Sequence, residues 1–343
     1  MNPSADNIDR TGTGLTFSVI IPNHNGEDNL AEVLDAVFGA GESSLEVIVV
    51  DDASTDNSRR IAADYPVRWI PHRTCRGAAA ARNTGASAAA GRILVFVDND
   101  IVIPADTFRK LKAHYRDNRV EGVIGLLRPL TRYGNLCSQY KNFYMHYTYL
   151  KLPDEVTVFY TSIASIRRET FQDVGGFDPL YRSATIEDME FGIRATAAGY
   201  KIIIDRSLQV DHIRHYTLAS LLKTDFRRAT GLAKMALRDR LSRKKKAGYA
   251  TTSPSFLSGI VLSVISVILA AAGLIFSSPV LLLSALPAFI LVAVVNMRFI
   301  AALGRLTVPG YSLSAAILIF LDMLAFGAGL IHGVLGFCGG RRY

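Results

Sequence analysis

The chain has 343 residues, of which 50% are hydrophobic and 20% charged, and its formal net charge is +8. This composition excludes a disordered or collagen-like chain, and the length fits about two or three structural units. The three cysteines are far apart and odd in number, which excludes a disulfide scaffold and favours a reducing compartment.

The first 16 residues are polar and lack the apolar core of a secretory signal, so we expect a flexible N-terminus at 1–16. A folded α/β domain is predicted over 17–215, because short apolar runs alternate there with amphipathic stretches. Such an alternation predicts a mostly parallel sheet with right-handed crossovers. The expected strands are 17–22, 45–50, 67–70 and 93–97, and the expected helices are 27–38 and 77–90.

Acidic residues follow two of the predicted strands. The second strand ends in Asp51 and Asp52, and the fourth ends in Asp98, Asn99 and Asp100. Ligands bind beyond the carboxyl ends of strands in parallel sheets, where two carboxylate clusters repel each other unless a cation or hydrogen-bond donors lie between them. Carboxylate oxygens suit Mg²⁺ or Mn²⁺, so we expect a divalent metal here. A helix cap or turn is the alternative for an isolated pair of this kind.

Five ordered motifs carry a resemblance to a known family. They are SVIIPNHN (18–25), VIVVDDASTDNS (47–58), RGAAAARNTGASAAAGRILVFVDND (76–100), GGFDP (175–179) and IEDMEFGIRATAAGY (186–200). This succession resembles the family-2 inverting glycosyltransferases, which have the GT-A fold, a Rossmann-like α/β domain. The resemblance covers about 17–215 and implies a nucleotide-sugar donor, a divalent metal and one catalytic carboxylate.

The resemblance also implies roles for individual residues of this chain. Asp188 looks like the general base, Asp100 looks like the metal ligand, and His212 or His215 is similar to a histidine that completes the metal or diphosphate site, with His212 preferred. Other matching positions would contact the nucleotide or its phosphates: Pro22, Asn23, Asp51, Asp52, Arg82, Asp98 and Glu187.

Physical chemistry agrees with this assignment. A diphosphate leaving group gains negative charge as the glycosidic bond breaks, and a divalent cation stabilises that charge. An acceptor hydroxyl needs a carboxylate to take its proton, and Asp188 opens an amphipathic helix whose N-terminus favours an ionised group. The alternatives are that Glu187 and Asp188 only cap that helix and that Arg82 is solvated.

A basic segment precedes the C-terminal apolar part of the chain. Eleven Lys/Arg and two Asp lie between Arg214 and Lys246, a local charge of +9 that leaves about −1 for the rest of the chain. The basic character therefore belongs to one segment and does not indicate a nucleic-acid-binding protein. We expect 216–254 to be a basic juxtamembrane helical segment in contact with anionic lipid headgroups.

The residues from 255 to 338 are expected to form about three transmembrane helices. The stretches 256–276, 279–297 and about 312–337 are each close to the ~20 apolar residues that a spanning helix needs. Asp322 in the third stretch is expected to meet Asn296 or a hydroxyl from a neighbouring helix. Arg341 and Arg342 fall on the opposite side from the basic segment in a three-span topology, which conflicts with the usual distribution of positive charge.

These features favour a metal-dependent glycosyltransferase (hexosyltransferase class) of the cell envelope. It would be a multi-pass protein of the inner membrane with a cytoplasmic catalytic domain. The expected donor is a UDP-sugar, and the expected acceptor is a polyprenyl phosphate or a glycolipid. A polymer synthase that extrudes its product is disfavoured, because 223–229 lacks the tryptophan of the Gln-x-x-Arg-Trp motif of processive relatives. The alternatives are a polysaccharide synthase subunit and a catalytically silent nucleotide-sugar-binding protein.

Overall fold

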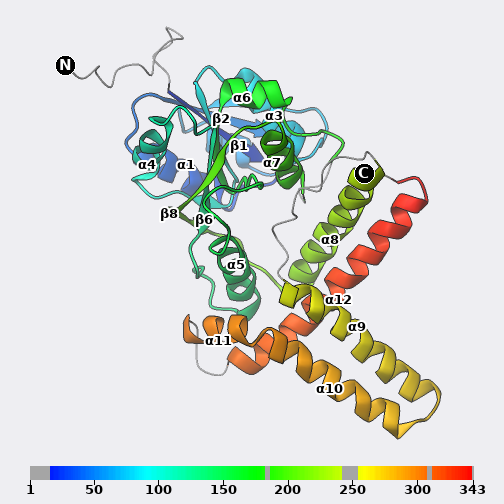
Figure 1. Ribbon diagram of the computed structural model, residues 1–343. Helices are drawn as coiled ribbons and strands as arrows, with labels where there is room; N and C mark the ends of the chain where they lie inside the picture. Colours follow the sequence, from blue (N-terminus) through cyan, green and yellow to red (C-terminus); the bar gives the residue numbers. More distant parts are fainter. Residues whose placement is uncertain (1–15, 182–185, 242–253, 307–310, 342–343) are drawn as a thin grey trace. The chain divides into compact units, whose positions relative to one another are not determined.

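The computed structural model describes residues 16–181, 186–241, 254–306 and 311–341 (Figure 1). The chain divides into two compact units. The first runs to Arg128 and resumes with Leu152–Ile213, and the second joins Pro129–Lys151 to the part that follows Arg214. Residues 129–151 therefore group with the C-terminal helices, although the sequence places them inside a continuous catalytic domain. Residues 1–15 and 242–253 of the predicted terminus and juxtamembrane segment lie outside the described residues.

The first unit is built on an eight-stranded mixed sheet with the order β3-β2-β1-β4-β7-β6-β8-β5. Strands β7 and β5 run antiparallel to their neighbours, and the other strands share one direction. The predicted mostly parallel sheet is confirmed. The strands are β1 (Phe17–Asn23), β2 (Leu45–Asp51), β3 (Arg68–Pro71), β4 (Ile93–Val97), β5 (Ile101–Val102), β6 (Gly122–Leu127), β7 (Ile163–Arg167) and β8 (Ile202–His212).

Helices connect and cover these strands. The helices of the first unit are α1 (Leu30–Gly39), α2 (Ser58–Ala62), α3 (Ala78–Ala88), α4 (Thr107–Tyr115), α6 (Arg168–Val174) and α7 (Glu187–Ala197). Strands β1, β2 and β4 are rich in Val, Ile and Leu and almost wholly buried, as expected for strands covered on both faces. Helix α3 packs very close to the sheet, because a Cβ atom at Gly85 would lie 2.5 Å from a methyl carbon of Ile20.

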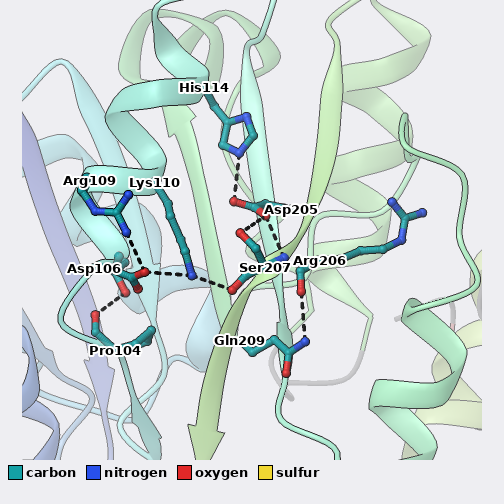
Figure 2. Close-up of polar contacts among 10 residues, drawn as sticks. Pro104, Asp106, Arg109, Lys110, His114, Asp205, Arg206, Ser207 and Gln209 are labelled. Carbon is teal, nitrogen blue, oxygen red and sulfur yellow. Dashed lines mark hydrogen bonds and ion pairs between the residues drawn. The ribbon is translucent and has the colours of Figure 1, made fainter.

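Polar contacts fix α4 against the beginning of β8 (Figure 2). His114 Nε2 lies 2.9 Å from Asp205 Oδ2, and Lys110 Nζ donates to the Ser207 carbonyl at 2.6 Å. The Ser207 hydroxyl donates to Asp205 and not to the histidine, so these three side chains do not form a nucleophilic relay. Asp205 precedes His212 by seven residues, roughly 20 Å along a strand, so this cluster lies at the end of β8 away from His212.

The second unit is helical. Its helices are α5 (Leu136–Tyr149), α8 (Leu218–Leu241), α9 (Pro254–Ile275), α10 (Pro279–Val295), α11 (Met297–Leu306) and α12 (Tyr311–Cys338). Two of them, α9 and α12, are long and apolar enough to cross a membrane. Helices α10 and α11 meet at a bend of 60° and would make a third span if counted together.

The core of the second unit is aromatic where α5 meets α11. Tyr140, Phe143, Tyr144 and Tyr147 of α5 surround Phe299, with ring centroids 5.3–6.1 Å apart. These aromatic residues therefore pack within the second unit.

Buried polar groups lie beside this aromatic core. The Tyr140 hydroxyl donates to Asp322 at 2.7 Å, which confirms the expected hydroxyl partner of Asp322. Next to it, the ammonium of Lys141 forms a buried ion pair with Asp225 of α8. Ionisable groups of α5, α8 and α12 thus meet inside the second unit.

Candidate active site

The candidate site lies where β1, β2 and β4 end. In the sheet register Asn23 is paired with Asp51, and Ile20 is paired with Phe96, two residues before Asp98. The structure thus brings the predicted acidic strand ends to one edge of the sheet, as the parallel arrangement requires. Pro22 is half-buried immediately before Asn23.

Asn23 links the strand ends to one another. Its amide nitrogen donates to Ser54 at 3.2 Å and, at 3.4 Å, to Asp51, and its oxygen accepts a hydrogen bond from Asn99 at 3.1 Å. Gly26 closes over this group: a Cβ atom there would lie 2.2 Å from Asn23 Oδ1 and 2.5 Å from Asn99 Nδ2. A side chain at position 26 would therefore break the link between β1 and β4.

The loops after β1 and β2 hold each other in place. Asn25 has a positive φ of 51°, and its side-chain oxygen accepts the Thr55 backbone N–H at 2.8 Å. The Ser54 hydroxyl accepts the Asn25 backbone N–H at 2.8 Å, and Asp56 accepts that of Glu27 at the same distance. Polar residues of both motifs thus serve to shape the edge of the site.

Asp51 and Asp52 have different surroundings. Asp52 is 4% exposed, and its two oxygens accept hydrogen bonds from His72, Cys75 and the backbone N–H groups of Arg76 and Gly77 at 2.7–3.2 Å. Burial raises the pKa of Asp52, but the backbone donors and His72 outweigh it, and the net pKa is lowered. Asp52 is thus an ionised carboxylate that holds the loop 72–77.

Asp51 is bound much more loosely. From the part of the chain that the structure describes, its Oδ1 accepts two long hydrogen bonds, of 3.4 Å from Asn23 and 3.3 Å from the Ser54 backbone. The resemblance places both aspartates among the residues that would contact the nucleotide or its phosphates. The structure distinguishes them by the number and length of their hydrogen bonds to the protein.

Arg82 of α3 joins the end of β4 to the beginning of α7. Its guanidinium donates to Asp98 at 2.6 Å and to Glu187 at 2.9 Å, and it lies 5.8 Å from the centre of the Phe177 ring. Its side chain is 4% exposed, so the alternative of a solvated arginine is excluded. Buried arginine is well suited to two carboxylates because its planar fork offers several donors.

Electrostatics keep this group charged. Burial lowers the pKa of Arg82, but the negative charges of Asp98, Glu187 and, more weakly, Asp188 raise it by a larger amount. The pKa of Arg82 is therefore raised. The pKa of Asp98 is raised as well, by burial first and by the neighbouring Asp100, against the opposing effect of Arg82. A further positive group beside Asp98 would lower the pKa of its carboxyl again.

Asp188 lies in the first turn of α7, next to Glu187. Asp188 is half-buried, its Oδ1 accepts the Met189 backbone N–H at 2.7 Å, and it is close enough to Arg82 to affect the pKa of that residue. Glu187 is 3% exposed and is held by Arg82. The arginine therefore fixes the beginning of the helix that carries Asp188.

The Gly-Gly-Phe motif packs against the same arginine helix. Asn83 donates to the Phe177 carbonyl at 2.7 Å and accepts the Phe177 backbone N–H at 2.9 Å. Gly176 has a φ of +68°, and a Cβ atom there would lie 2.8 Å from Asn83 Oδ1. Helix α3, the 175–177 turn and α7 are thus tied together around Arg82.

Asp100 and His212 meet across the β5–β8 pairing. His212 Nε2 lies 3.5 Å from Asp100 Oδ2, and the backbone N–H of Ile213 donates to the Asp100 carbonyl at 2.8 Å. Within the described residues, no cluster of three or more His, Cys, Asp or Glu side chains is placed to hold a metal ion. A carboxylate and an imidazole at this distance nevertheless fit two ligands of an ion whose other ligands come from outside the protein.

Some contacts of the site were not anticipated from the sequence. His72 was not identified from the sequence, although this residue directly follows β3 at the same edge of the sheet as Asp52. Asn83 lies inside one of the quoted motifs and Gly26 directly follows another, but the spacing of the motifs does not indicate which residues these two contact. His215 belongs to the second unit, where its ring lies 5.2 Å from Tyr133. The structure thus places His212, not His215, within the unit that contains Asp100.

The sequence matches the Glycosyl transferase family 2 profile over residues 18–175. Glycosyltransferase AglE of Haloferax volcanii is 27% identical over 72% of this chain and 86% of its own length. The O-antigen chain rhamnosyltransferase WbaN of Salmonella anatum is 29% identical over 59% of this chain and 67% of its own length. Two other curated relatives are matched over only 26% and 32% of their length.

A solved structure shares the fold. The mannosyltransferase PcManGT of Pyrobaculum calidifontis, in complex with GDP-Man and Mn²⁺, superposes with a TM-score of 0.57 and 22% identity, over 92% of this chain and 86% of its own. The sheet of the first unit is accordingly GT-A-like. Residues 18–175 thus match the Glycosyl transferase family 2 profile, and the first unit has a GT-A-like fold. Two of the helices that follow are apolar enough to span a membrane.

Proposed function

We propose that this chain is a membrane-anchored inverting glycosyltransferase that moves one sugar from a nucleotide-sugar donor to a polyprenyl phosphate or glycolipid acceptor at the cytoplasmic face. The observation that carries the proposal is Arg82, buried between Asp98 at the end of β4 and Glu187 at the beginning of α7. It places the strand end that would face the donor beside the helix turn that carries Asp188. A binding module has no need of a further carboxylate there.

The donor would lie along the edge formed by β1, β2 and β4. Asn23 and Pro22 line the end of β1, and Asp51 has the carboxylate whose weak internal hydrogen bonds leave it able to accept from a nucleotide base. Asp52 acts through the loop 72–77 that it holds. A UDP-sugar is the expected donor, and GDP- and dTDP-sugars are the alternatives that the donor panel below separates.

Asp100 and His212 would hold Mg²⁺ or Mn²⁺ together with the diphosphate oxygens of the donor. The ion would supply positive charge for the leaving diphosphate. Support comes from the 3.5 Å contact between the two side chains, and a Mn²⁺ complex is known for the similar mannosyltransferase. Asp98, held by Arg82, orients the stretch that leads to Asp100.

Asp188 would take the proton from the acceptor hydroxyl as that oxygen attacks the anomeric carbon from the face opposite the leaving group. The N-terminus of α7 favours its ionised form, which is the form a base needs. With a polyprenyl phosphate as acceptor, the attacking oxygen is already ionised, and Asp188 would instead orient it. The apolar helices would bring the domain to the membrane, where such acceptors reside.

The experiment is transfer of radiolabelled sugar by the full chain in detergent or lipid nanodiscs. A panel of UDP-, GDP- and dTDP-sugars is offered with polyprenyl phosphate or glycolipid acceptors and with Mn²⁺, Mg²⁺ or EDTA. We expect transfer from one donor, loss of transfer with EDTA, and a large loss of kcat with Asp188→Asn while nucleotide binding is retained. Asp64→Asn, an exposed carboxylate of the same unit, is the matched control.

The outcomes separate the alternatives. A product that carries one added sugar supports single transfer, whereas a ladder of products indicates a polysaccharide synthase subunit. Full activity of the Asp188→Asn variant would contradict the proposed role of Asp188 as the base. Metal-dependent nucleotide binding without transfer to any acceptor of the panel would indicate the silent binding protein and contradict the proposal.

A further inference from the structure

Helix α12 is apolar along its whole length, yet its two halves have different neighbours. By length and composition alone it qualifies as a membrane span over Leu313–Cys338. A spanning helix that begins on the side of the catalytic domain would carry its second half across the bilayer. The contacts of the second unit show instead where that half lies.

The middle of α12 is level with α5. Asp322 accepts a hydrogen bond from Tyr140 at 2.7 Å and interacts electrostatically with Lys141 and Asp225. The chain enters α5 from β6 of the catalytic domain through residues 128–135 and returns to β7 of the same domain through residues 150–162. Because the chain both enters and leaves α5 on the side of that domain, α5 does not cross the membrane, and Asp322, which contacts α5, lies on the same side of the membrane.

The first half of α12 packs on the same end of α9 and α10. A Cβ atom at Gly259 of α9 would lie 2.3 Å from Met323, and the amide of Asn296, just after α10, contacts the Met323 sulfur at 3.9 Å. Gly259 is near the beginning of α9, and Asn296 follows the end of α10, so both belong to the end of this pair from which the chain enters and leaves it.

The second half of α12 runs beside α8 (Figure 1). A Cβ atom at Gly329 would lie 2.3 Å from the Phe226 carbonyl oxygen, and one at Gly333 would lie 2.5 Å from that of Thr230. The Thr230 hydroxyl donates to the Gly329 carbonyl at 3.1 Å, so the two backbones are in direct contact. The residue numbers increase in the same direction along both helices, from Phe226 to Thr230 and from Gly329 to Gly333, so α8 and α12 run parallel.

Helix α8 is too highly charged to lie in hydrocarbon. Its 24 residues include six Lys/Arg and two Asp, and each such charge costs roughly 2.5–3.5 kcal/mol at the centre of a bilayer. Since α8 remains outside the hydrocarbon, the half of α12 that contacts it does so as well. The residues from Tyr311 to Asp322 that remain measure only ~18 Å, against a hydrocarbon core of ~30 Å.

Helices α9 and α10 have the opposite character. Between residues 255 and 297 there is no charged residue, and large apolar side chains are exposed along both helices and at the turn between them, as at Ile268, Phe276 and Leu283. Only 28% of the most apolar window of α9 is buried within the protein, against 44% of that of α12. At 22 and 17 residues, α9 and α10 are long enough, or nearly so, to cross.

We propose that the α9–α10 hairpin is the membrane-crossing element of this chain and that α12 ends on the same side of the membrane as the catalytic domain. The hairpin meets lipid tails, and the Lys and Arg side chains of α8 meet anionic headgroups. This topology places Arg298, Arg305 and Arg341 on the side of the basic segment, which removes the charge conflict of a three-span topology. It does not depend on the reaction that the chain catalyses.

The test measures which thiols a membrane-impermeant polymer maleimide reaches in sealed membrane vesicles that hold the full chain. The native cysteines serve as reporters: Cys75 lies exposed in the catalytic domain and Cys338 exposed at the end of α12. Three variants carry one thiol each. They are Cys75→Ser with Cys137→Ser, Cys137→Ser with Cys338→Ser, and all three cysteines replaced by serine with Ser277→Cys in the hairpin turn.

We expect Cys338 to be labelled on the same side of the vesicles as Cys75, without detergent, and the Ser277→Cys thiol to be labelled only from the opposite side or after detergent. Labelling of Cys338 from the same side as the turn would overturn the proposal. So would labelling of the turn from the same side as Cys75. If a variant fails to give a monodisperse protein in detergent, protease removal of a C-terminal epitope from the wild-type chain in the same vesicles gives the same decision.

Discussion

Asp52→Asn is expected to destabilise the catalytic domain by ~3–5 kcal/mol. The carboxylate of Asp52 accepts the backbone N–H groups of Arg76 and Gly77 on different oxygens. Asparagine has only one oxygen, so in either orientation its NH₂ group would face a backbone donor. The variant loses a charge-assisted hydrogen bond worth ~1.5–3 kcal/mol and leaves a donor unsatisfied at ~1–3 kcal/mol.

The chain carries its own probe for this measurement. Trp69, the one tryptophan in the sequence, lies in β3 three residues before His72. Its fluorescence during urea unfolding of the full chain in detergent reports on the catalytic domain next to the affected loop. Asp51→Asn is the matched control, because its longer hydrogen bonds of 3.3–3.4 Å predict a loss of under ~1 kcal/mol.

The pH dependence gives an independent check. The pKa of Asp52 is lowered in the folded state, so its ionisation stabilises the fold above the unfolded value of ~3.9 and this contribution is lost as the pH falls towards the folded value. The stability difference between wild type and Asp52→Asn should therefore narrow below about pH 4. Equal losses for Asp51→Asn and Asp52→Asn, or a difference that does not change with pH, would refute the reasoning.

Three further predictions concern other contacts. Arg82→Lys should lower kcat by ~10–100-fold with little change in donor affinity, because one ammonium cannot hold Asp98 and Glu187 in the same geometry. Steady-state kinetics would measure kcat, and calorimetry would measure nucleotide binding. An unchanged kcat would contradict this prediction. Gly26→Ala should weaken nucleotide binding, because the Cβ atom of the alanine would lie 2.2 Å from Asn23 Oδ1. An unchanged nucleotide affinity by calorimetry would argue against a donor site at this edge of the sheet. Lys141→Met should lower the thermal unfolding temperature in detergent, because it leaves the carboxylate of Asp225 buried without its partner at a cost of ~3–5 kcal/mol. The double variant Lys141→Met with Asp225→Leu should recover much of the lost stability. A double variant as unstable as the single variant would disprove the pairing argument.

The alternation of apolar runs and amphipathic stretches predicted four of the eight strands, β1–β4, and the helices α1 and α3. The four predicted strands are present, and that at Ile93–Val97 has the predicted bounds. Strands that are buried on both faces are continuous runs of aliphatic residues, which the sequence shows directly. The helical unit was harder, because the sequence of α12 records apolar character but not which neighbour covers each half.

The candidate site followed the same division. The resemblance grouped the strand ends and Asp188 into one candidate site. It did not indicate that the carboxylate of Asp52 accepts hydrogen bonds from the loop 72–77 while that of Asp51 accepts them from Asn23 and Ser54. Two adjacent aspartates are chemically identical in a sequence, and their difference arises only when His72 and Gly77 return to the strand from 20–25 residues later. The grouping of 129–151 with the C-terminal helices was hidden for a similar reason, since its partners lie some 80–180 residues away.

The position of α5 between β6 and β7 has a practical consequence for anyone who wishes to study the catalytic domain in water. Truncation after Ile213 would remove α8–α12 and leave α5 behind. The aromatic side chains that now surround Phe299 would then face solvent, and Lys141 would lose the carboxylate that neutralises it. A soluble version therefore needs two changes: the C-terminal truncation and replacement of 129–151 by a short polar linker.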